Sequence, residues 1–283
     1  MQSLWMVVAS FCFACLGVFV KLASDTYSIV EIIFYRYFFS LLLTFILIRM
    51  RGISIRTPNW MFQLWRSISG LFASFLLFYA LALLPVATAI TLSYTSPLFL
   101  VLFLRLLGKN KLGLKMFGTL FLGFFGIALL LRPAFHLDQL PGEICGLGSG
   151  FMSGLAFYNL KVLGGRGEPE ERTVFYLSLV STIGSALWML FSEFHPVDLR
   201  GGMALLGVAL FGTFAQLAMT RSYRTGNTLI SASLAYSTVV FSSIFGIVLW
   251  GDTLSVSAWS AIALIITSGV LTTWFSRRSQ PEN

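Results

Sequence analysis

Charged residues are scarce in this 283-residue chain: they make up 11% of the sequence, whereas 57% of the residues are apolar and 28 are phenylalanine. A soluble globular domain carries about 25% charged residues, so this composition excludes that class. Apolar runs of about 20 residues, the length that a helix needs to cross hydrocarbon, recur along the whole sequence. They lack the alternation of membrane-barrel strands. The composition therefore predicts an all-α membrane protein.

Cysteine and histidine are also rare, with 3 and 2 residues respectively. Cys12, Cys15 and Cys145 all fall inside apolar runs, where a thiol behaves as a small hydrophobic group. Although Cys12 and Cys15 form a CxxC pair, a thiolate would be buried there, which disfavours redox or metal chemistry. We expect no metal and no cofactor.

Ten candidate membrane helices follow from the apolar runs and the residues that interrupt them. Six of the prolines lie at or near the proposed boundaries, as expected of a residue that cannot continue a helix. The predicted spans are residues 3–22, 29–49, 60–83, 86–107, 113–131, 142–163, 171–192, 201–222, 228–250 and 255–275.

The basic residues are distributed unequally between the two ends of these spans. The net charge of +8 could suggest nucleic acid, but no nucleic-acid motif is visible, and the bases between apolar runs are explained by membrane orientation. With a cytoplasmic N-terminus, only Lys21, Arg132 and Arg200 lie outside. The cytoplasmic set is Arg49, Arg51, Arg56, Arg105, Lys109, Lys111, Lys115, Lys161, Arg166, Arg172, Arg221, Arg224, Arg277 and Arg278. The distribution predicts a multi-pass inner (plasma) membrane protein with both termini in the cytoplasm.

The second half of the chain resembles the first. Lys21 and Lys161 each end a predicted span and lie 140 positions apart, and Glu31 falls on Glu171 at the same offset. The segment "YTSPLF" at 94–99 aligns with "YSTVVF" at 236–241, an offset of 142. Because five spans is an odd number, the second half would start from the opposite side of the membrane. We therefore predict ten transmembrane helices as two inverted five-helix repeats, residues 1–137 and 138–283.

Three features together resemble a known family. They are an arginine within the second span, "FYALALLPVATAITLSYTSPLF" across the third and fourth spans, and "GIVLWGDTLS" closing the ninth. This pattern is similar to the drug/metabolite transporter superfamily, EamA type, over the whole chain. The resemblance implies exchange of small organic solutes through a central cavity lined by both repeats. The chain departs from the family pattern at Asp252, where a glutamate is usual, and at Asn110, the first-half equivalent.

The fourth span carries a proline among hydroxyl-bearing residues. Pro97 removes one backbone hydrogen bond and crowds the carbonyl of Ser93, which in hydrocarbon needs another partner. Ser93, Ser96 and Pro97 share one helical face, with Tyr94 beside it. This stripe is either a solute-binding surface or a packing bend whose hydroxyls bond to their own turn. The recurrence of Ser233 and Tyr236 in the ninth span favours solute binding, although Val239 replaces the proline there.

Two arginines and two glutamates are candidates for binding, gating or coupling. Arg36 and Arg66 each lie about seven residues into a span, roughly 10 Å from its boundary. An intramembrane base is costly and is a functional candidate, although both could still reach the headgroups. The acidic residues all lie at or beyond helix ends, so we expect facilitated or exchange transport, or coupling through Glu31 or Glu171.

Further polar and aromatic groups at membrane depth are solute-binding candidates or helix-to-helix contacts. They are Tyr158, Asn159, Gln216 and Trp250. Four glycines spaced four apart, Gly142, Gly146, Gly150 and Gly154, predict that another helix approaches the sixth span closely.

The function predicted is export of small organic metabolites, such as amino acids or similar amphipathic solutes, by alternating access. One alternative is uptake or exchange of a nucleoside-like metabolite such as S-adenosylmethionine, which the family resemblance allows. Channel and membrane-scaffold roles remain non-carrier alternatives. An intramembrane hydrolase is disfavoured, because Ser153 lies mid-span while His136 and His195 lie in outer loops, so no catalytic residue is assigned. The expected partners are the solute and the bilayer, without nucleic acid, for a monomer or weak homodimer.

Overall fold

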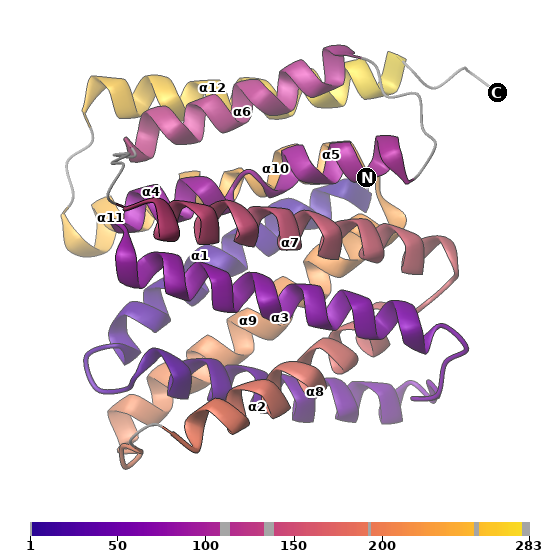
Figure 1. Ribbon diagram of the computed structural model, residues 1–283, viewed down its shortest axis with the longest axis vertical. Helices are drawn as coiled ribbons and strands as arrows, with labels where there is room; N and C mark the ends of the chain where they lie inside the picture. Colours follow the sequence, from indigo (N-terminus) through magenta and orange to yellow (C-terminus); the bar gives the residue numbers. More distant parts are fainter. Residues whose placement is uncertain (1, 108–113, 133–138, 192–193, 252–254, 279–283) are drawn as a thin grey trace.

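The computed structural model describes residues 2–107, 114–132, 139–191, 194–251 and 255–278, and within these ranges all regular secondary structure is helical. After a short 3-10 turn at Gln2–Leu4, the chain forms a bundle of helices. They are α1 (Trp5–Ala23), α2 (Ile29–Met50), α3 (Trp60–Leu83), α4 (Val86–Ser93), α5 (Ser96–Leu106), α6 (Leu114–Leu131), α7 (Leu140–Gly165), α8 (Glu170–Met189), α9 (Leu199–Thr225), α10 (Thr228–Ala235), α11 (Ser237–Trp250) and α12 (Val256–Arg278). In this bundle α3, α6, α7 and α12 run in roughly the same direction, whereas α1 and α9 cross that direction obliquely (Figure 1).

The helices in the described ranges form ten rods, because α4 continues into α5 and α10 into α11. Seven of the rods are long and apolar enough to cross a membrane, and Phe117–Leu131 within α6 is a shorter apolar helix. The other two, α7 and α8, are more polar: α7 contains seven glycines, and α8 begins with three charged residues and contains five serines and threonines. The all-α membrane fold is thus confirmed, and the count of ten spans stays a prediction.

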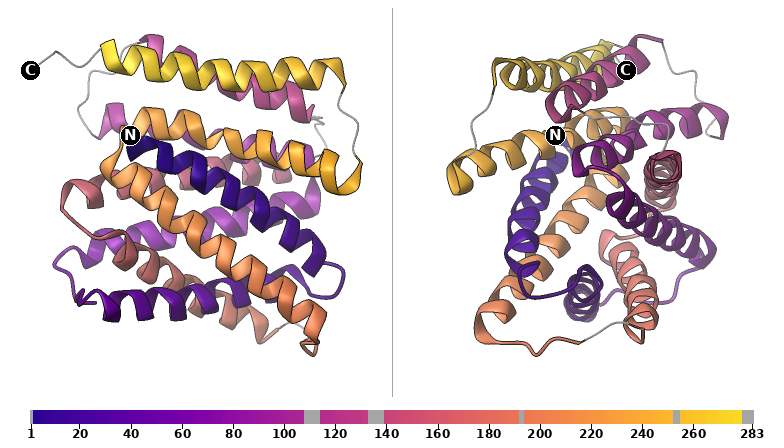
Figure 2. Two further views of the ribbon diagram at one scale, coloured as in Figure 1. Left: turned by 180° about the vertical axis from the view of Figure 1, so that it is seen from behind. Right: turned by 60° about the vertical axis from the view of Figure 1, so that its left-hand side comes forward.

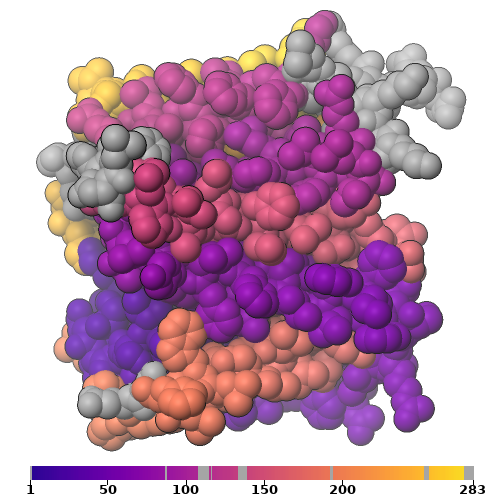
Figure 3. Space-filling view, in the orientation of Figure 1, coloured from indigo at the N-terminus to yellow at the C-terminus, as the bar shows by residue number. Residues whose placement is uncertain are grey.

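The outer surface is apolar, as the composition requires. Trp65, Phe72 and Tyr79 are spaced seven apart on α3, and each is more than half exposed. A seven-residue spacing places side chains on one face of a helix. Side chains of α3 and α7 cover the middle of the face seen in Figure 3. Such an apolar exterior suits a protein whose surrounding solvent is lipid.

The fourth and ninth predicted spans are each interrupted at a tyrosine. The first interruption lies at Tyr94 and Thr95, between α4 and α5, and the second at Tyr236, between α10 and α11. At both points the backbone bonds tighten from four residues to three: Thr95 N–H donates to the Leu92 carbonyl at 3.1 Å and Tyr236 N–H to the Ser233 carbonyl at 3.3 Å. Both rods are therefore broken at equivalent places, although only the first contains a proline.

At these interruptions, side-chain hydroxyl groups donate hydrogen bonds to backbone carbonyl groups of the preceding turn. The Thr95 hydroxyl donates to the Leu92 carbonyl, and in the second half the Ser237 hydroxyl donates to the Leu234 carbonyl at 2.6 Å. A side-chain hydroxyl that bonds three residues back competes with the backbone amide and bends a helix. The second interruption thus has a cause in its serine and threonine content, without a proline.

The helix contacts are paired between the two halves. In the order of the repeat, α1, α2, α3, α4–α5 and α6 correspond to α7, α8, α9, α10–α11 and α12. The contact of α3 with α7 has its counterpart in α9 with α1, and that of α2 with α9 in α8 with α3. In the pairs α2 with α8 and α6 with α12, each helix contacts its own counterpart in the other half. This is the contact pattern of a pseudo-twofold arrangement, with α6 and α12 together at one side of the bundle (Figure 2).

The glycine ladder of α7 packs against the first interrupted rod, which confirms the predicted close approach. A Cβ added at Gly146 would lie 2.9 Å from the Leu92 side chain, and one at Gly154 would lie 3.0 Å from the Ser96 carbonyl oxygen. At Gly150 it would lie 2.8 Å from the carbonyl oxygen of Leu92, beside the interruption. The ladder therefore fixes the position of the broken helix.

Candidate functional site

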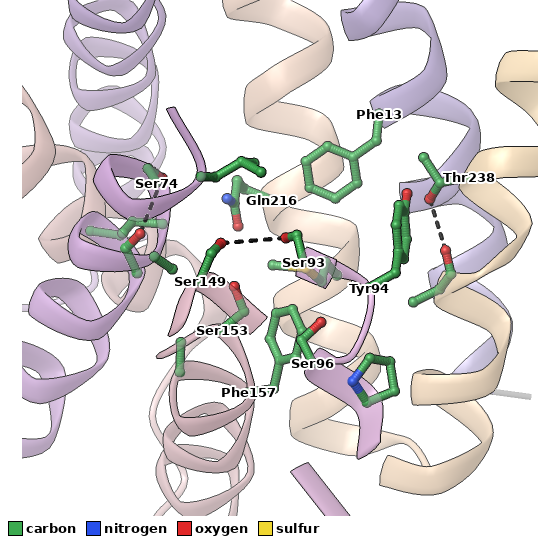
Figure 4. Close-up of a pocket in the computed structure, with 18 of the residues that line it drawn as sticks. Phe13, Ser74, Ser93, Tyr94, Ser96, Ser149, Ser153, Phe157, Gln216 and Thr238 are labelled. Atoms are coloured by element: carbon green, nitrogen blue, oxygen red, sulfur yellow. Dashed lines mark hydrogen bonds between the residues drawn. The ribbon is translucent and has the colours of Figure 1, made fainter. Parts of the chain in front are cut away.

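A cavity of about 330 Å³ lies between the two halves of the chain. The first half contributes lining residues from α1, α2, α3 and the α4–α5 interruption, and the second half from α7 to α11. Figure 4 shows the labelled side chains converging from several helices around this space. Since small-molecule sites are concave and few per protein, this cavity is the candidate site for a solute.

Hydroxyl groups make up one part of the wall. The Ser93 and Ser149 hydroxyl oxygens are 3.4 Å apart, which joins α4 to α7 (Figure 4). Ser153 lies one turn further along α7, and Ser96 begins α5 just past the interruption. These groups can donate to or accept from a polar solute.

Two guanidinium groups supply the charge of this wall. Arg66 of α3 is only 3% exposed, and its Nε has no hydrogen-bond partner within the described part of the chain. Arg36 of α2 also lines the cavity, with its guanidinium carbon 4.9 Å from the centre of the Tyr37 ring. Both arginines therefore face the cavity in the interior of the protein.

Aromatic side chains form the apolar part of the wall. Phe13 of α1 and Phe157 of α7 line the cavity together with Tyr94 (Figure 4). The Tyr94 ring packs on Tyr236, with 6.2 Å between ring centres, so the two interruptions meet. Tyr236 is fully buried behind Tyr94, and its hydroxyl has no partner among the described residues.

The structure brings seven of the sequence-predicted residues to the cavity wall. These are Arg36, Arg66, Ser93, Tyr94, Ser96, Pro97 and Gln216. The other predicted residues lie elsewhere: Tyr158, Asn159, Ser233, Tyr236, Trp250, Glu31 and Glu171. Asn110, Asp252 and His136 lie outside the described residues.

Four of the predicted residues outside the cavity wall are bonded to or packed against other parts of the protein. Ser233 donates to the Ile230 carbonyl at 3.0 Å and lines a separate, largely apolar groove against α12. Trp250 ends α11, where the Lys21 ammonium lies 3.8 Å from its ring centre. Tyr158 packs with Phe103 at 6.4 Å between ring centres, and Asn159 is buried within α7.

Several wall residues were not among those predicted from the sequence. Ser149, Ser153 and Phe157 follow at intervals of four on α7, on the face next to the glycine ladder. That spacing was a usable signal, because a helix held closely by small residues must turn the neighbouring face toward the same partner. Thr238 also carried a signal, because it falls on Ser96 when residues 94–99 are aligned with 236–241. Phe13 carried none, because phenylalanines occur throughout these helices.

A polar cluster around Glu168 lies at one end of the bundle, in the connection between α7 and α8. Its carboxylate accepts hydrogen bonds from Thr57, from Asn59 at 2.8 Å and from Arg172 at 2.8 Å. Burial raises the pKa of Glu168, but these hydrogen bonds and the charge of Arg172 outweigh burial and bring it below the ordinary value for a glutamate. Glu171 joins the same end by pairing with Arg51.

A second cluster, around Glu31, the third residue of α2, lies at the opposite end. Glu31 forms a capping box with Ser28 and accepts a hydrogen bond from the His195 backbone amide at 2.7 Å. Its other oxygen is 3.0 Å from His195 Nδ1. Nearby, Asp198 caps α9 and lies 3.5 Å from the Tyr27 hydroxyl. At each end, therefore, the first half is hydrogen-bonded to a connection of the second half: Asn59 to Glu168 at one end, and Glu31 to His195 at the other. Figure 1 shows the α7–α8 connection and the start of α2 at opposite ends of the bundle.

Proteins of known family and structure are similar to this chain in sequence and in fold. The family described as EamA-like transporter family matches residues 1–132 and again residues 140–274. A pseudopaline exporter of Pseudomonas aeruginosa is 28% identical over 94% of this chain and 90% of its own length. A riboflavin transporter of Brucella anthropi is 25% identical, with 92% and 94% coverage. A solved crystal structure shares the fold, with a TM-score of 0.86 over 98% of both chains at 20% identity.

The family match covers nearly the whole chain and falls in two successive ranges on either side of residues 133–139. The matched relatives named above are small-molecule transporters, and their names describe no catalysis. The chain therefore belongs to the EamA-like transporter family and is a multi-pass membrane transporter of the drug/metabolite type.

Proposed function

We propose that the protein exports small organic solutes across the inner membrane by alternating access, and that the cavity at the α4–α5 interruption is the solute site. The observation that carries this proposal is one polar and aromatic cavity lined by both halves of the chain. In transporters built from two repeats, a midplane site between the repeats and interrupted helices beside it are the usual arrangement. The two halves, residues 1–137 and 138–283, would rock about this site.

The clusters at the two ends are the proposed gates. Glu168 and Glu171 hold one end closed through Thr57, Asn59 and Arg51, and Glu31 holds the other through His195. Alternating access requires one of these clusters to separate while the other stays closed. Glu31 and Glu171 are thus assigned to gating or coupling, whereas Arg36 is assigned to the solute site that it lines.

The proposed orientation places the Glu168 end in the cytoplasm. The N-terminal turn lies at this end, because Ser3 bonds to Asn227 at the α9–α10 junction and Arg224 bonds to the Glu168 carbonyl oxygen at 3.1 Å. In a background without native cysteines, single cysteines replacing Arg166 and Arg224 should react with a membrane-impermeant maleimide from the cytoplasmic side. A cysteine replacing Arg200 should react from the outside. Labelling of positions 166 and 224 from opposite sides would refute this topology.

Flux in reconstituted vesicles tests the transport function. The purified protein should mediate saturable counterflow of at least one solute from a panel of amino acids, carboxylic acids, amines and flavins. Ser153→Trp should fill the cavity and abolish this flux, whereas Ser260→Trp, on an exposed position of α12, should preserve it. Unchanged flux in Ser153→Trp would place the pathway elsewhere. Flux that never saturates would indicate a channel, and no flux would favour a scaffold.

A further inference from the structure

We propose that the solute is an organic anion whose carboxylate binds the Arg66 guanidinium in the cavity. This inference rests on the proposed function, in which the cavity is the solute site. Among the described residues that line the cavity, the charged side chains are Arg36 and Arg66. The ion pairs formed elsewhere in the described chain use Arg51, Arg172, Arg224 and His195.

Arg66 is placed to receive a carboxylate. Its Nε is buried and has no hydrogen-bond partner in the described part of the protein, although a guanidinium at membrane depth is costly unless it is paired. A carboxylate can accept from Nε and one terminal nitrogen at once, in the bidentate geometry that a guanidinium favours. A solute carboxylate would therefore satisfy the donor that the protein leaves open.

Two glycines make room for the two guanidinium groups. A Cβ added at Gly70 would lie 2.6 Å from Arg66 Nη1, and one at Gly212 would lie 2.9 Å from Arg36 Nε. Gly70 and Gly212 are 142 positions apart, the same offset that aligns residues 94–99 with 236–241. Equivalent positions of α3 and α9 thus each form a notch that holds a guanidinium beside the cavity. The glycines recur at equivalent positions, although the arginines come from α3 and α2, and both guanidinium groups line the cavity.

The other residues of the cavity wall indicate the chemistry of the rest of the solute. Gln216 lines the cavity, and its carbonyl oxygen is buried with no partner in the described ranges, so it needs a hydrogen-bond donor. Phe13 and Phe157 offer apolar surface. The class that fits is a small carboxylic acid with one hydroxyl or amide donor and an apolar portion. A cationic solute would be repelled by the two guanidinium groups.

Charge also sets the direction of transport. Uncoupled movement of a monoanion carries one negative charge across the membrane. Where the cytoplasmic side is negative, each 100 mV of potential favours the outward distribution of that anion by about 50-fold. An anionic solute therefore provides a physical reason for export without a coupling ion.

Binding of matched acid and amide pairs tests the inference. The probes are 3-phenyllactate, 4-hydroxyphenylacetate and 2-hydroxyisocaproate, each with its primary amide, and the measurement is dissociation constants from thermal shifts of the detergent-purified protein. At least one acid should bind at least tenfold tighter than its amide. Arg66→Gln should reduce that preference below threefold, whereas Arg105→Gln, on an exposed position near the end of α5, should leave it unchanged.

Gly70→Ala is the second variant, because the added methyl group meets the flexible end of Arg66 and should displace the guanidinium without unfolding α3. It should weaken acid binding and leave amide binding unchanged. The inference is overturned if no acid of the panel binds tighter than its amide, or if the preference survives both Arg66→Gln and Gly70→Ala. Flux of neutral or cationic solutes that Ser153→Trp abolishes, together with no acid preference, would overturn the anion inference and leave the proposed transport function standing.

Discussion

Replacing Gly150 by alanine tests the contact that positions the interrupted helix. The new Cβ would lie 2.8 Å from the Leu92 carbonyl oxygen, a backbone atom that cannot move aside alone. Alanine gains up to about 1 kcal/mol over glycine in a helix, but overpacking a tight contact costs about 1–3 kcal/mol. The variant should therefore lose about 1–2 kcal/mol of unfolding free energy.

Gly148→Ala is the matched control on the same helix. Its Cβ would approach the end of the flexible Leu76 side chain at 3.3 Å, so the helix gain should dominate and the protein should become more stable by about 0.5–1 kcal/mol. The assay is an unfolding titration in mixed detergent micelles, followed by circular dichroism. Equal stability of the two variants would refute the assignment of Gly150 as the contact that holds the interruption.

Three further predictions concern the two ends and the second notch. The pKa of Glu168 is lowered in the folded protein, so its contribution to stability is complete above pH 4.5, the ordinary pKa, and is lost as the pH falls through the lower folded pKa. Glu168→Gln should therefore lower the melting temperature at pH 7 and make the melting temperature less dependent on pH below 4.5. An unchanged dependence on acid pH would contradict this. His195→Ala removes the imidazole partner of the buried Glu31 carboxylate and should lower the melting temperature. Adding Glu31→Gln should restore part of the loss, because the neutral glutamine side chain leaves no unpaired charge buried. If the double variant melts no higher than His195→Ala, the buried charge is not the cause of the loss. Gly212→Ala should weaken solute binding about tenfold with little change in melting temperature, and unchanged binding would remove that notch from the site.

Much of the fold follows from hydrophobic pattern alone. Apolar run length places nearly every helix within a few residues, because a helix that crosses lipid must satisfy its backbone internally and cover about 30 Å. The glycine ladder of α7 was also readable, since small residues at a four-residue spacing have few other uses in such a helix.

Residues of the cavity wall were predicted from the sequence only where the residue type is unusual for a membrane helix. Arg66, Ser93 and Pro97 stand out because a charge, or a proline among hydroxyls, is unusual in an apolar run. Ser233 was predicted as their counterpart in the ninth span, yet it lies in a groove against α12 and falls on Thr91 at the offset of 142. The two interrupted rods bend similarly at Tyr94 and Tyr236, and they turn equivalent positions to the cavity, because Ser93 and Ser96 fall on Ala235 and Thr238 at the offset of 142.

The sequence by itself determined that the chain is an all-α membrane protein, where its helices begin and end, and which helix face can approach a neighbour. The tertiary structure alone decided which polar groups share a cavity, which acidic residues link the two halves at each end, and that Arg66 Nε has no partner in the described part of the chain. The physical reason is that membrane insertion depends on each segment's own composition. The cavity depends instead on bringing together residues that are far apart in the sequence, such as Arg66 and Gln216, which are 150 positions apart.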